Sequence, residues 1–179
     1  MSLADRERWN LKYSKGYRTS LHKTLLEFYH LASLGRALEL ACGTGENAIF
    51  LAQKGFQVDA VDISDVAIDV ARNKARELNL NINFIVADLD EYPLKEEYYH
   101  LVVVFYYLNR TLAAPIVRSL KRGGVLIYET YNRNHLHIRG DFNPDYLLEE
   151  GELLRLFKDL QVIHYREEFN VSTFVGRKP

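Results

Sequence analysis

The sequence has 179 residues and a net charge of −1, with 47% hydrophobic and 26% charged residues. This balance is typical of a globular domain and disfavours a basic surface built to coat nucleic acid. No apolar run reaches the roughly 20 residues that a membrane span needs. The single cysteine, Cys42, excludes an internal disulfide, and the N-terminus lacks an apolar signal core, so we expect a reducing, cytoplasmic setting.

Helices and short apolar strands are predicted to alternate along the chain. Apolar residues recur at helical spacing in several segments, and the predicted helices span 3–14, 18–33, 45–54, 65–78, 110–120 and 146–158. Short apolar runs predict strands over 36–41, 56–62, 82–88, 100–107 and 125–131. The segments 160–168 and 170–178 alternate in polarity about Phe169-Asn170, which is typical of an antiparallel hairpin.

This order of elements predicts a doubly wound α/β fold. Five rounds of strand and helix favour a mostly parallel sheet with helices on both faces, and the C-terminal antiparallel hairpin brings the sheet to seven strands. We expect a single domain over 1–179 with a Rossmann-like fold. Ligands of such sheets bind beyond the carboxyl ends of the strands, so the functional residues should follow strands.

A glycine-containing loop follows the first predicted strand. Gly43 and Gly45 allow a tight turn and let a ligand approach bare backbone, and the next helix begins with free N–H groups. Asp62 ends the following strand about 20 residues on, where an acid can bind both hydroxyls of a ribose. The glycine pair alone is also compatible with a plain strand-to-helix turn, but the loop and the acid together predict an adenosine-type ligand.

Two cofactors compete for this loop. A nicotinamide dinucleotide places its pyrophosphate over the start of the helix, where Glu46 in the first helical turn would repel it. Glu39, inside the first strand, adds a second acid near the loop. S-adenosylmethionine carries a sulfonium and an ammonium group and no phosphate, so the two acids favour it.

At this point the chain resembles a known family. "LELACGTGENAIFLAQKG" resembles the first motif of the class I S-adenosylmethionine-dependent methyltransferases, acid-x-Gly-x-Gly-x-Gly, with Ala41 in place of the first glycine. "VDAVDIS", "VADLDEYP" and "YHLVVVFYYLNR" resemble the next three motifs, so the resemblance covers about 36–178. "FYYLNR" and "EEGELLRLFKDLQVIHYREE" are most similar to small bacterial enzymes such as tellurite-resistance and thiopurine methyltransferases.

The resemblance implies a site for S-adenosylmethionine, which is released as S-adenosylhomocysteine. It implies that the glycine loop approaches the methionine portion, that Asp62 holds the ribose, and that Glu39 steadies the ammonium group through water. It also suggests that the N-terminal helices over 1–34 form a lid on a core over 36–178, with packing of Trp9 and Tyr13 on the sheet as the alternative. The residues expected at the cofactor are Trp9, Tyr13, Glu39, Ala41, Cys42, Gly43, Gly45, Asp62, Ile63, Asp88, Leu89 and Phe105.

The remaining cofactor contacts also follow from the resemblance. Ile63 would pack on the adenine, Asp88 would accept from its amino group, and the backbone of Leu89 would bond its ring. The carbonyl of Phe105 would receive the ammonium group. Cys42 is interpreted as a small packing residue of the loop and not as a nucleophile.

Two regions are candidates for the methyl acceptor. Tyr106 and Tyr107 follow the fourth strand and are expected to border the methyl group, with packing against the sheet as the alternative. The family's proline pair for methylating base amino groups is missing there. The loop 128–146 carries Arg133, His135 and Arg139, whose donors suit an anionic acceptor, with a solvated polar loop as the alternative.

The sequence therefore predicts an enzyme that moves a methyl group to a small-molecule acceptor, with a soft anion or a thiol as the favoured class. A NAD-dependent oxidoreductase and a non-catalytic S-adenosylmethionine-binding module are the alternatives, and a protein or RNA acceptor stays open. No metal site, membrane partner or nucleic-acid partner is predicted, and the expected assembly is a monomer or homodimer.

Overall fold

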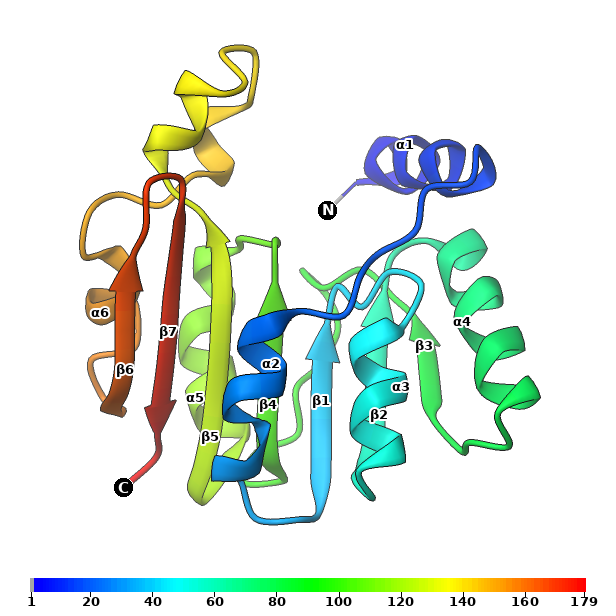
Figure 1. Ribbon diagram of the computed structural model, residues 1–179, viewed down its shortest axis with the longest axis horizontal. Coiled ribbons are helices and arrows are strands. Elements are labelled where there is room, and N and C mark those ends of the chain that lie inside the picture. Colours follow the sequence, from blue (N-terminus) through cyan, green and yellow to red (C-terminus); the bar gives the residue numbers. More distant parts are fainter. Residues whose placement is uncertain (1) are drawn as a thin grey trace.

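The computed structural model describes residues 2–179 and contains one seven-stranded sheet (Figure 1). Its strands are β1 (Arg36–Leu40), β2 (Gln57–Asp62), β3 (Asn83–Val86), β4 (Tyr99–Phe105), β5 (Leu120–Tyr131), β6 (Gln161–Glu167) and β7 (Val171–Arg177). Its α-helices are α1 (Leu3–Ser14), α2 (Lys23–Phe28), α3 (Glu46–Gln53), α4 (Asp65–Glu77), α5 (Ala113–Ser119) and α6 (Glu152–Leu156).

The strand order confirms the predicted doubly wound sheet. The strands run β3-β2-β1-β4-β5-β7-β6, and the order reverses between β1 and β4. The first five strands pair in parallel, whereas β7 pairs antiparallel with both β5 and β6. The last two strands therefore form the expected antiparallel hairpin, and the carboxyl ends of β1 and β4 meet where ligands of such sheets bind.

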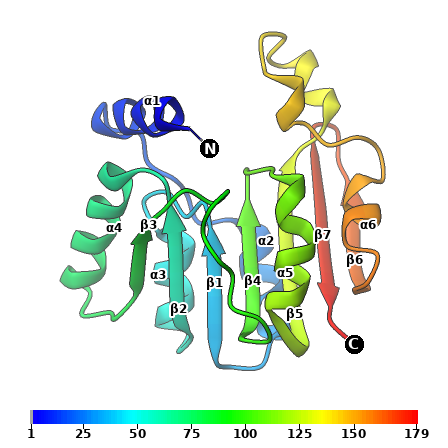
Figure 2. The ribbon, with the colours of Figure 1, turned by 180° about the vertical axis from the view of Figure 1, so that it is seen from behind.

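Helices cover both faces of the sheet, and each face has its own core. On one face α2, α3 and α4 bury Leu25, Leu51 and Ile68 against strand residues such as Val103. On the other face α5 and α6 pack against residues that alternate with these along the strands (Figure 2). The alternation explains why β4 is apolar at nearly every position, because both of its faces are buried.

The predicted helix over 18–33 is wrong in its first part. The segment from Lys15 to His22 is not helical, and only Lys23–Phe28 forms an α-helix, followed by a 3₁₀ turn at Tyr29–Leu31. Two backbone N–H groups in the second half of this segment bond to side chains instead of to the preceding turn. Thr19 donates to the Thr44 hydroxyl at 3.0 Å, and His22 donates to the Asn47 side chain at 3.1 Å.

Two further predicted boundaries differ from the structure. Of the helix predicted over 146–158, only Glu152–Leu156 is α-helical, because the preceding Leu147 and Leu148 are fully buried in extended backbone. The strand predicted over 100–107 ends at Phe105, since Tyr106 adopts a φ of 53°. Both differences arise from tertiary contacts that helical or strand spacing does not report.

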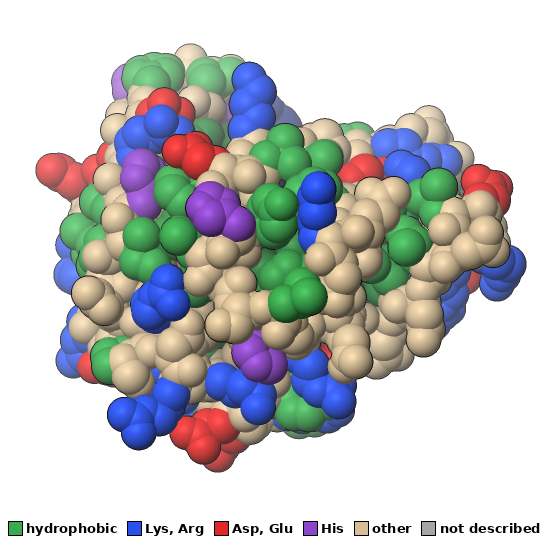
Figure 3. Space-filling model, turned by 60° about the horizontal axis from the view of Figure 1, so that its bottom comes forward, with side chains coloured by type: hydrophobic (Ala, Val, Ile, Leu, Met, Phe, Trp, Pro, Cys, Tyr) green, Lys and Arg blue, Asp and Glu red, His purple; other side chains and the backbone are tan. Residues whose placement is uncertain are grey.

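Two segments rise above the carboxyl edge of the sheet (Figure 1). One is α1, which stands over β2, β3 and the start of α4, and the other is the irregular segment that follows β5 and contains the 3₁₀ helices at Arg133–His137 and Pro144–Tyr146. On the opposite edge of the sheet, basic, acidic and apolar side chains are interspersed (Figure 3). Within residues 2–179, no helix is long and apolar enough to cross a membrane.

Candidate cofactor and acceptor site

The loop between β1 and α3 has an unusual backbone. Ala41, Gly43 and Gly45 all adopt positive φ values, of 56°, 55° and 82°. A Cβ atom on Gly45 would lie 2.9 Å from the Cβ of Ala71 in α4, so glycine is required there by both conformation and space. At position 41 the chain holds alanine in the left-handed region, where an L residue is strained. The family motif's glycine at this position would have no such strain.

Asp62 fastens this loop to β2. Its carboxylate accepts from the backbone N–H of Gly43 at 2.8 Å and from that of Ser64 at 2.9 Å. The side chain is buried, and burial raises the pKa of Asp62 although the backbone donors lower it. The acid predicted to hold the ribose therefore lies directly beside the glycine loop.

Glu39 lies beneath the loop as a buried acid with an unsatisfied atom. It is 2% exposed, and Nδ2 of Asn47 donates to its Oε1 at 2.9 Å. Its Oε2 has no hydrogen-bond partner among the residues that the structure describes. Burial raises the pKa of Glu39 to about 8. An orphaned buried carboxylate oxygen is costly, and a cation or an ordered water beside it would remove the cost.

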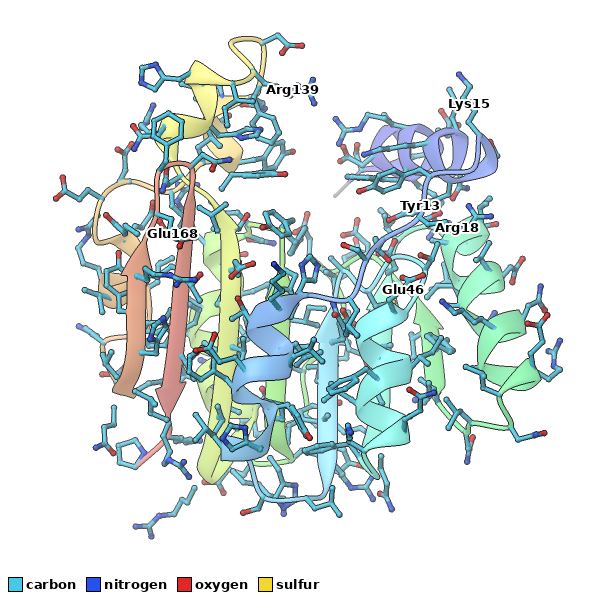
Figure 4. All side chains as sticks on the ribbon, viewed as in Figure 1. Tyr13, Lys15, Arg18, Glu46, Arg139 and Glu168 are labelled. Carbon is cyan, nitrogen blue, oxygen red and sulfur yellow. The ribbon has the colours of Figure 1, made fainter. Side chains whose placement is uncertain are left out.

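The N-terminal segment covers the glycine loop. Tyr13 is buried, and its hydroxyl would lie 2.8 Å from a Cβ built on Gly43. Thr19 exchanges hydrogen bonds with Thr44 and donates to Glu46 at 2.5 Å. Figure 4 shows Tyr13 descending from α1 toward Glu46. Trp9 is half-buried and stacks on Tyr13 with ring centroids 5.9 Å apart.

The other residues expected at the cofactor lie along the same edge of the sheet. Ile63 and Leu89 are buried where the chain leaves β2 and β3, and Asp88 is half-buried and accepts from the backbone of Asp90 at 2.9 Å. Phe105 ends β4 and is buried. Cys42 is buried within the loop, where burial raises the pKa of its thiol, so the structure gives it packing contacts and no activation.

A row of aromatic rings in contact runs along the ends of β4 and β5. We call His22, Tyr106, Tyr131, His135 and Phe142 the aromatic row. Neighbouring ring centroids in it are 5.2, 4.7, 3.8 and 4.9 Å apart, in that order. The Tyr106 hydroxyl donates to the buried carboxylate of Glu129 at 3.3 Å. Strained backbone at Tyr106 is a feature that clusters at functional sites.

The remaining acceptor candidates are dispersed. Tyr107 packs among the core residues of the α5 face, and its carbonyl accepts from Tyr128 at 2.7 Å. Arg133 is exposed and pairs with Glu149. Arg139 pairs with Asp141 at 3.3 Å and extends toward α1 (Figure 4). Of the predicted acceptor residues, the structure therefore brings together Tyr106 and His135, through Tyr131.

Several known proteins similar to this chain are methyltransferases. Residues 37–124 match the family described as a methyltransferase domain. The probable S-adenosyl-L-methionine-dependent methyltransferase TehB of Haemophilus influenzae is 28% identical over 87% of this chain and 56% of its own length. A ubiquinone biosynthesis O-methyltransferase of Coxiella burnetii is 30% identical over 54% of this chain and 44% of its own length. The chain spans about half the length of these curated relatives.

Solved structures agree on the fold. The crystal structure of TehB from Haemophilus influenzae has a TM-score of 0.80 at 20% identity, over 96% of this chain and 67% of that chain. A structure from work on converting a disulfide bond into a thioacetal group during echinomycin biosynthesis has a TM-score of 0.78 at 20% identity, over 97% and 93% of the two chains. Together these matches identify a methyltransferase domain over residues 37–124 and support a class I S-adenosylmethionine-dependent methyltransferase that resembles TehB.

The cofactor of this methyltransferase is therefore S-adenosylmethionine, and the nicotinamide dinucleotide weighed from the sequence is set aside. The buried residues fit this choice. The unsatisfied Oε2 of Glu39 matches a cationic group, and Gly43 and Gly45 leave backbone open to close approach. Glu46 accepts hydrogen bonds from Thr19 and Thr44 and pairs with Lys74 at 3.5 Å. Its carboxylate thus lies where the pyrophosphate of a dinucleotide would need positive charge.

Several residues near the candidate site were not predicted from the sequence. Thr19 and His22 lie in a segment predicted to be helical, and Glu129 and Tyr131 lie at the end of a strand. In the sequence His22 is a histidine inside the predicted helix over 18–33, which has no functional meaning by itself. Their proximity to the glycine loop and to β4 is a consequence of the chain path and could not be inferred from spacing.

Proposed function

We propose that this methyltransferase transfers the methyl group of S-adenosylmethionine to a small molecule that attacks through a soft atom, a thiol or a soft anion. The observation that supports it most is the arrangement at the carboxyl edge of the sheet. There the acids Glu39 and Asp62 lie under the glycine loop, and the aromatic row begins at the end of the neighbouring β4.

The proposal assigns the donor side to residues already near one another. Asp62 would hold the ribose, Glu39 would take the ammonium group, and the carbonyl of Phe105 would add a second acceptor for that group. Ile63, with Leu89, would enclose the adenine. When bound, the cofactor supplies a methyl group on a positively charged sulfur. The protein's part is then to align the two reactants and exclude water, which contributes the larger share of many such accelerations.

The acceptor side is proposed to lie against Tyr106 and its ring neighbours. Polarizable sulfur packs favourably against aromatic rings, which supports a soft acceptor. One neighbour with the same fold takes part in converting a disulfide bond into a thioacetal, a reaction at sulfur. Arg139 would attract charged acceptors from the rim, while Arg133, which is paired with Glu149, would have the smaller effect.

The N-terminal segment is proposed to act as a lid. Tyr13 and Thr19 already contact the glycine loop, and Asn10 in α1 donates to Asp65 at 2.5 Å and accepts from Ser64 at 2.6 Å. These contacts connect α1 to the start of α4, beside the predicted ribose site. A lid of this kind would exclude water from the methyl group during transfer.

Calorimetric titration of the purified protein with S-adenosylmethionine and with S-adenosylhomocysteine tests the donor site. We expect both to bind with one site per chain. Absence of heat with either ligand, together with no change in melting temperature, would refute the proposed function. Transfer of a labelled methyl group to small thiols and soft anions then tests the acceptor class, and labelling of protein or RNA instead would move the acceptor to a macromolecule.

The first prediction concerns Asp62. Asp62→Asn keeps one acceptor for the backbone N–H groups but loses charge at the ribose site, so we expect affinity for S-adenosylhomocysteine to fall at least tenfold, roughly the loss of one charge-assisted hydrogen bond. Asp59→Asn is the matched control, because Asp59 lies on the same strand but bonds to Asn83 and Tyr99. An affinity within a factor of two of the unaltered protein would show that Asp62 is not a cofactor ligand.

A further inference from the structure

His22 is held by several contacts between the proposed donor side and the proposed acceptor side of the site. Its backbone N–H donates to Oδ1 of the buried Asn47, whose amide in turn donates to Glu39. Its imidazole stacks on Phe105 with centroids 4.3 Å apart and an angle of 13° between the ring planes. The backbone of His22 is therefore connected through Asn47 to Glu39, the acid proposed to bind the ammonium group, and its ring lies on Phe105 at the end of β4.

The ring of His22 also faces the acceptor side. It is the first member of the aromatic row, 5.2 Å from the ring of Tyr106. Two carboxylates act on it electrostatically, Glu46 at the start of α3 and Glu129 on β5, and both favour the protonated form. Burial has the larger, opposite effect and lowers the pKa of His22, so the imidazole is neutral at pH 7.

We propose that His22 is the catalytic base that accepts the proton of a small thiol while the thiol receives the methyl group. This inference rests on the proposed function and narrows its acceptor class from thiols and soft anions to thiols that are still protonated when they bind. Tyr106 and Tyr131 would then position the acceptor sulfur by ring contact. His22 lies outside the four sequence motifs of the family, so the motifs do not predict this role for it.

The charges around His22 favour a protonated acceptor. An anion formed in solution would have to enter beside the carboxylates of Glu46 and Glu129, which repel it. A neutral thiol enters without this cost, and passing its proton to His22 creates a thiolate and an imidazolium next to each other, with no change in net charge. The two carboxylates then stabilise the imidazolium.

The strength of the base also selects a thiol over an alcohol. Proton transfer becomes less efficient as the pKa difference grows. A free thiol has a pKa of about 8.5 and an ordinary imidazole one of about 6.5, and burial lowers the pKa of His22 further, so the acceptor group has to be fairly acidic. An aliphatic hydroxyl is far less acidic, so a neutral histidine without a further activating group would ionise it poorly. The buried carboxylate of Glu129 is already bonded to Thr24, Thr173 and Tyr106 and does not supply that activation.

The proposed step balances without another reactant. The thiol proton moves to a ring nitrogen of His22, and the electron pair of the broken S–H bond stays on the acceptor sulfur. That sulfur forms a bond to the methyl carbon as the carbon's bond to the donor sulfur breaks. The donor sulfur keeps the bonding pair and becomes a neutral thioether. The proton on His22 passes to solvent when the products leave.

A series of thiols of different acidity tests the proposal. Nitro-substituted thiophenols are ionised at neutral pH and need no base, whereas alkanethiols of similar size are protonated. We expect His22→Phe, which keeps a ring to stack on Phe105, to lower kcat/KM for alkanethiols roughly 100-fold or more and to leave nitrothiophenols within a few-fold. His164→Phe is the matched control, because His164 stacks on Phe28 on the α2 face, and should leave both classes unchanged.

A second measurement does not depend on turnover. In the complex with S-adenosylhomocysteine, an alkanethiol bound to the unaltered protein should show the ultraviolet absorbance of a thiolate below its solution pKa, and the His22→Phe complex should not. In addition, free imidazole should restore alkanethiol methylation to His22→Ala, in which the side-chain space is empty. It should not restore it to His22→Phe, in which a ring fills that space. A residue that only supports the structure would produce neither effect.

Three results would overturn the proposal. One is an equal loss for ionised and protonated thiols in His22→Phe. Another is failure of the unaltered protein to methylate any thiol of the series while it still binds S-adenosylmethionine. The third is the absence of the thiolate signal. Failure to bind S-adenosylmethionine at all would instead refute the proposed function, and the assignment of His22 would fall with it.

Discussion

Individual residues at the carboxyl edge of the sheet carry backbone strain and buried charge. Ala41 and Tyr106 are non-glycine residues with positive φ, and they follow β1 and β4, the two strands between which the strand order reverses. The backbone N–H of Tyr106 donates to the carbonyl of Glu129 at 2.8 Å, which helps hold the strained conformation. Strain of this kind persists only where surrounding contacts determine it, and both positions border the site.

Replacing Ala41 by glycine should stabilise the protein. Left-handed backbone costs an L residue about 1–2 kcal/mol, and glycine avoids this but loses about 0.5–1 kcal/mol more conformational freedom on folding. We therefore expect Ala41→Gly to raise the unfolding free energy by about 0.5–1 kcal/mol, measured by urea unfolding. Gly45→Ala is the opposite case and should destabilise by more than this, because its Cβ would meet Ala71. A destabilised Ala41→Gly would contradict the strain at position 41.

Glu39 should make stability depend on pH. Its pKa is raised from 4.5 to about 8 in the folded protein, so the folded state keeps a proton that the unfolded state releases. Its contribution is fully present below pH 4.5 and is lost as the pH rises from there through about 8. We expect the unfolding free energy of the unaltered protein to fall relative to that of Glu39→Gln across this window. Parallel pH profiles of the two proteins would contradict a raised pKa.

At the scale of elements, α1 is the least integrated helix. Its only buried side chain is Tyr13, and its polar links to α4 are those of Asn10. The linker that follows it is held by the side chains of Thr44 and Asn47, which replace the helical bonds predicted there. Elements with few buried contacts open locally at small free-energy cost, which is what a lid requires.

The only tryptophan of the chain, Trp9, reports on this helix. In urea titrations we expect the fluorescence of Trp9 to change at a lower urea concentration than the circular dichroism of the sheet, because α1 opens before the core. S-adenosylhomocysteine should raise the midpoint of the Trp9 transition more than that of the dichroism, because a ligand stabilises the state to which it binds. Coincident curves without ligand would show that α1 belongs to the cooperative core.

At the scale of the whole molecule, one sheet separates two apolar cores. Leu51 on α3 and Ile116 on α5 are buried on opposite faces, and each core depends on the same seven strands. We therefore propose that the sheet and its two cores unfold as one domain in a single transition, apart from the earlier opening of α1.

Substitutions in the two cores test this proposal. Leu51→Ala and Ile116→Ala should each lower the unfolding free energy by about 2–5 kcal/mol, and the double variant by their sum within about 0.5 kcal/mol, since the sites do not touch. Both should shift one transition of the circular dichroism without splitting it. Separate transitions for the two substitutions would indicate two folding units.

The sequence by itself determined the fold and the cofactor. Alternating strands and helices predict the doubly wound sheet. The glycine loop with Asp62 predicts an adenosine-type ligand, and the acids at 39 and 46 favour S-adenosylmethionine, because these signals are local. Strand ends are local too, so Asp62 and Phe105 could be expected near the same edge. The resemblance to the methyltransferase motifs covers the same local stretches.

Only the tertiary structure decided what surrounds the acceptor. The N-terminal segment leaves helical form because side chains of the glycine loop bond its backbone, and this brings His22 onto Phe105. The arginine and histidine cluster of the 128–146 loop is dispersed, since Arg133 turns to Glu149 while His135 stacks on Tyr131. These contacts join residues that are distant in the chain, and periodicity and spacing carry no information about them.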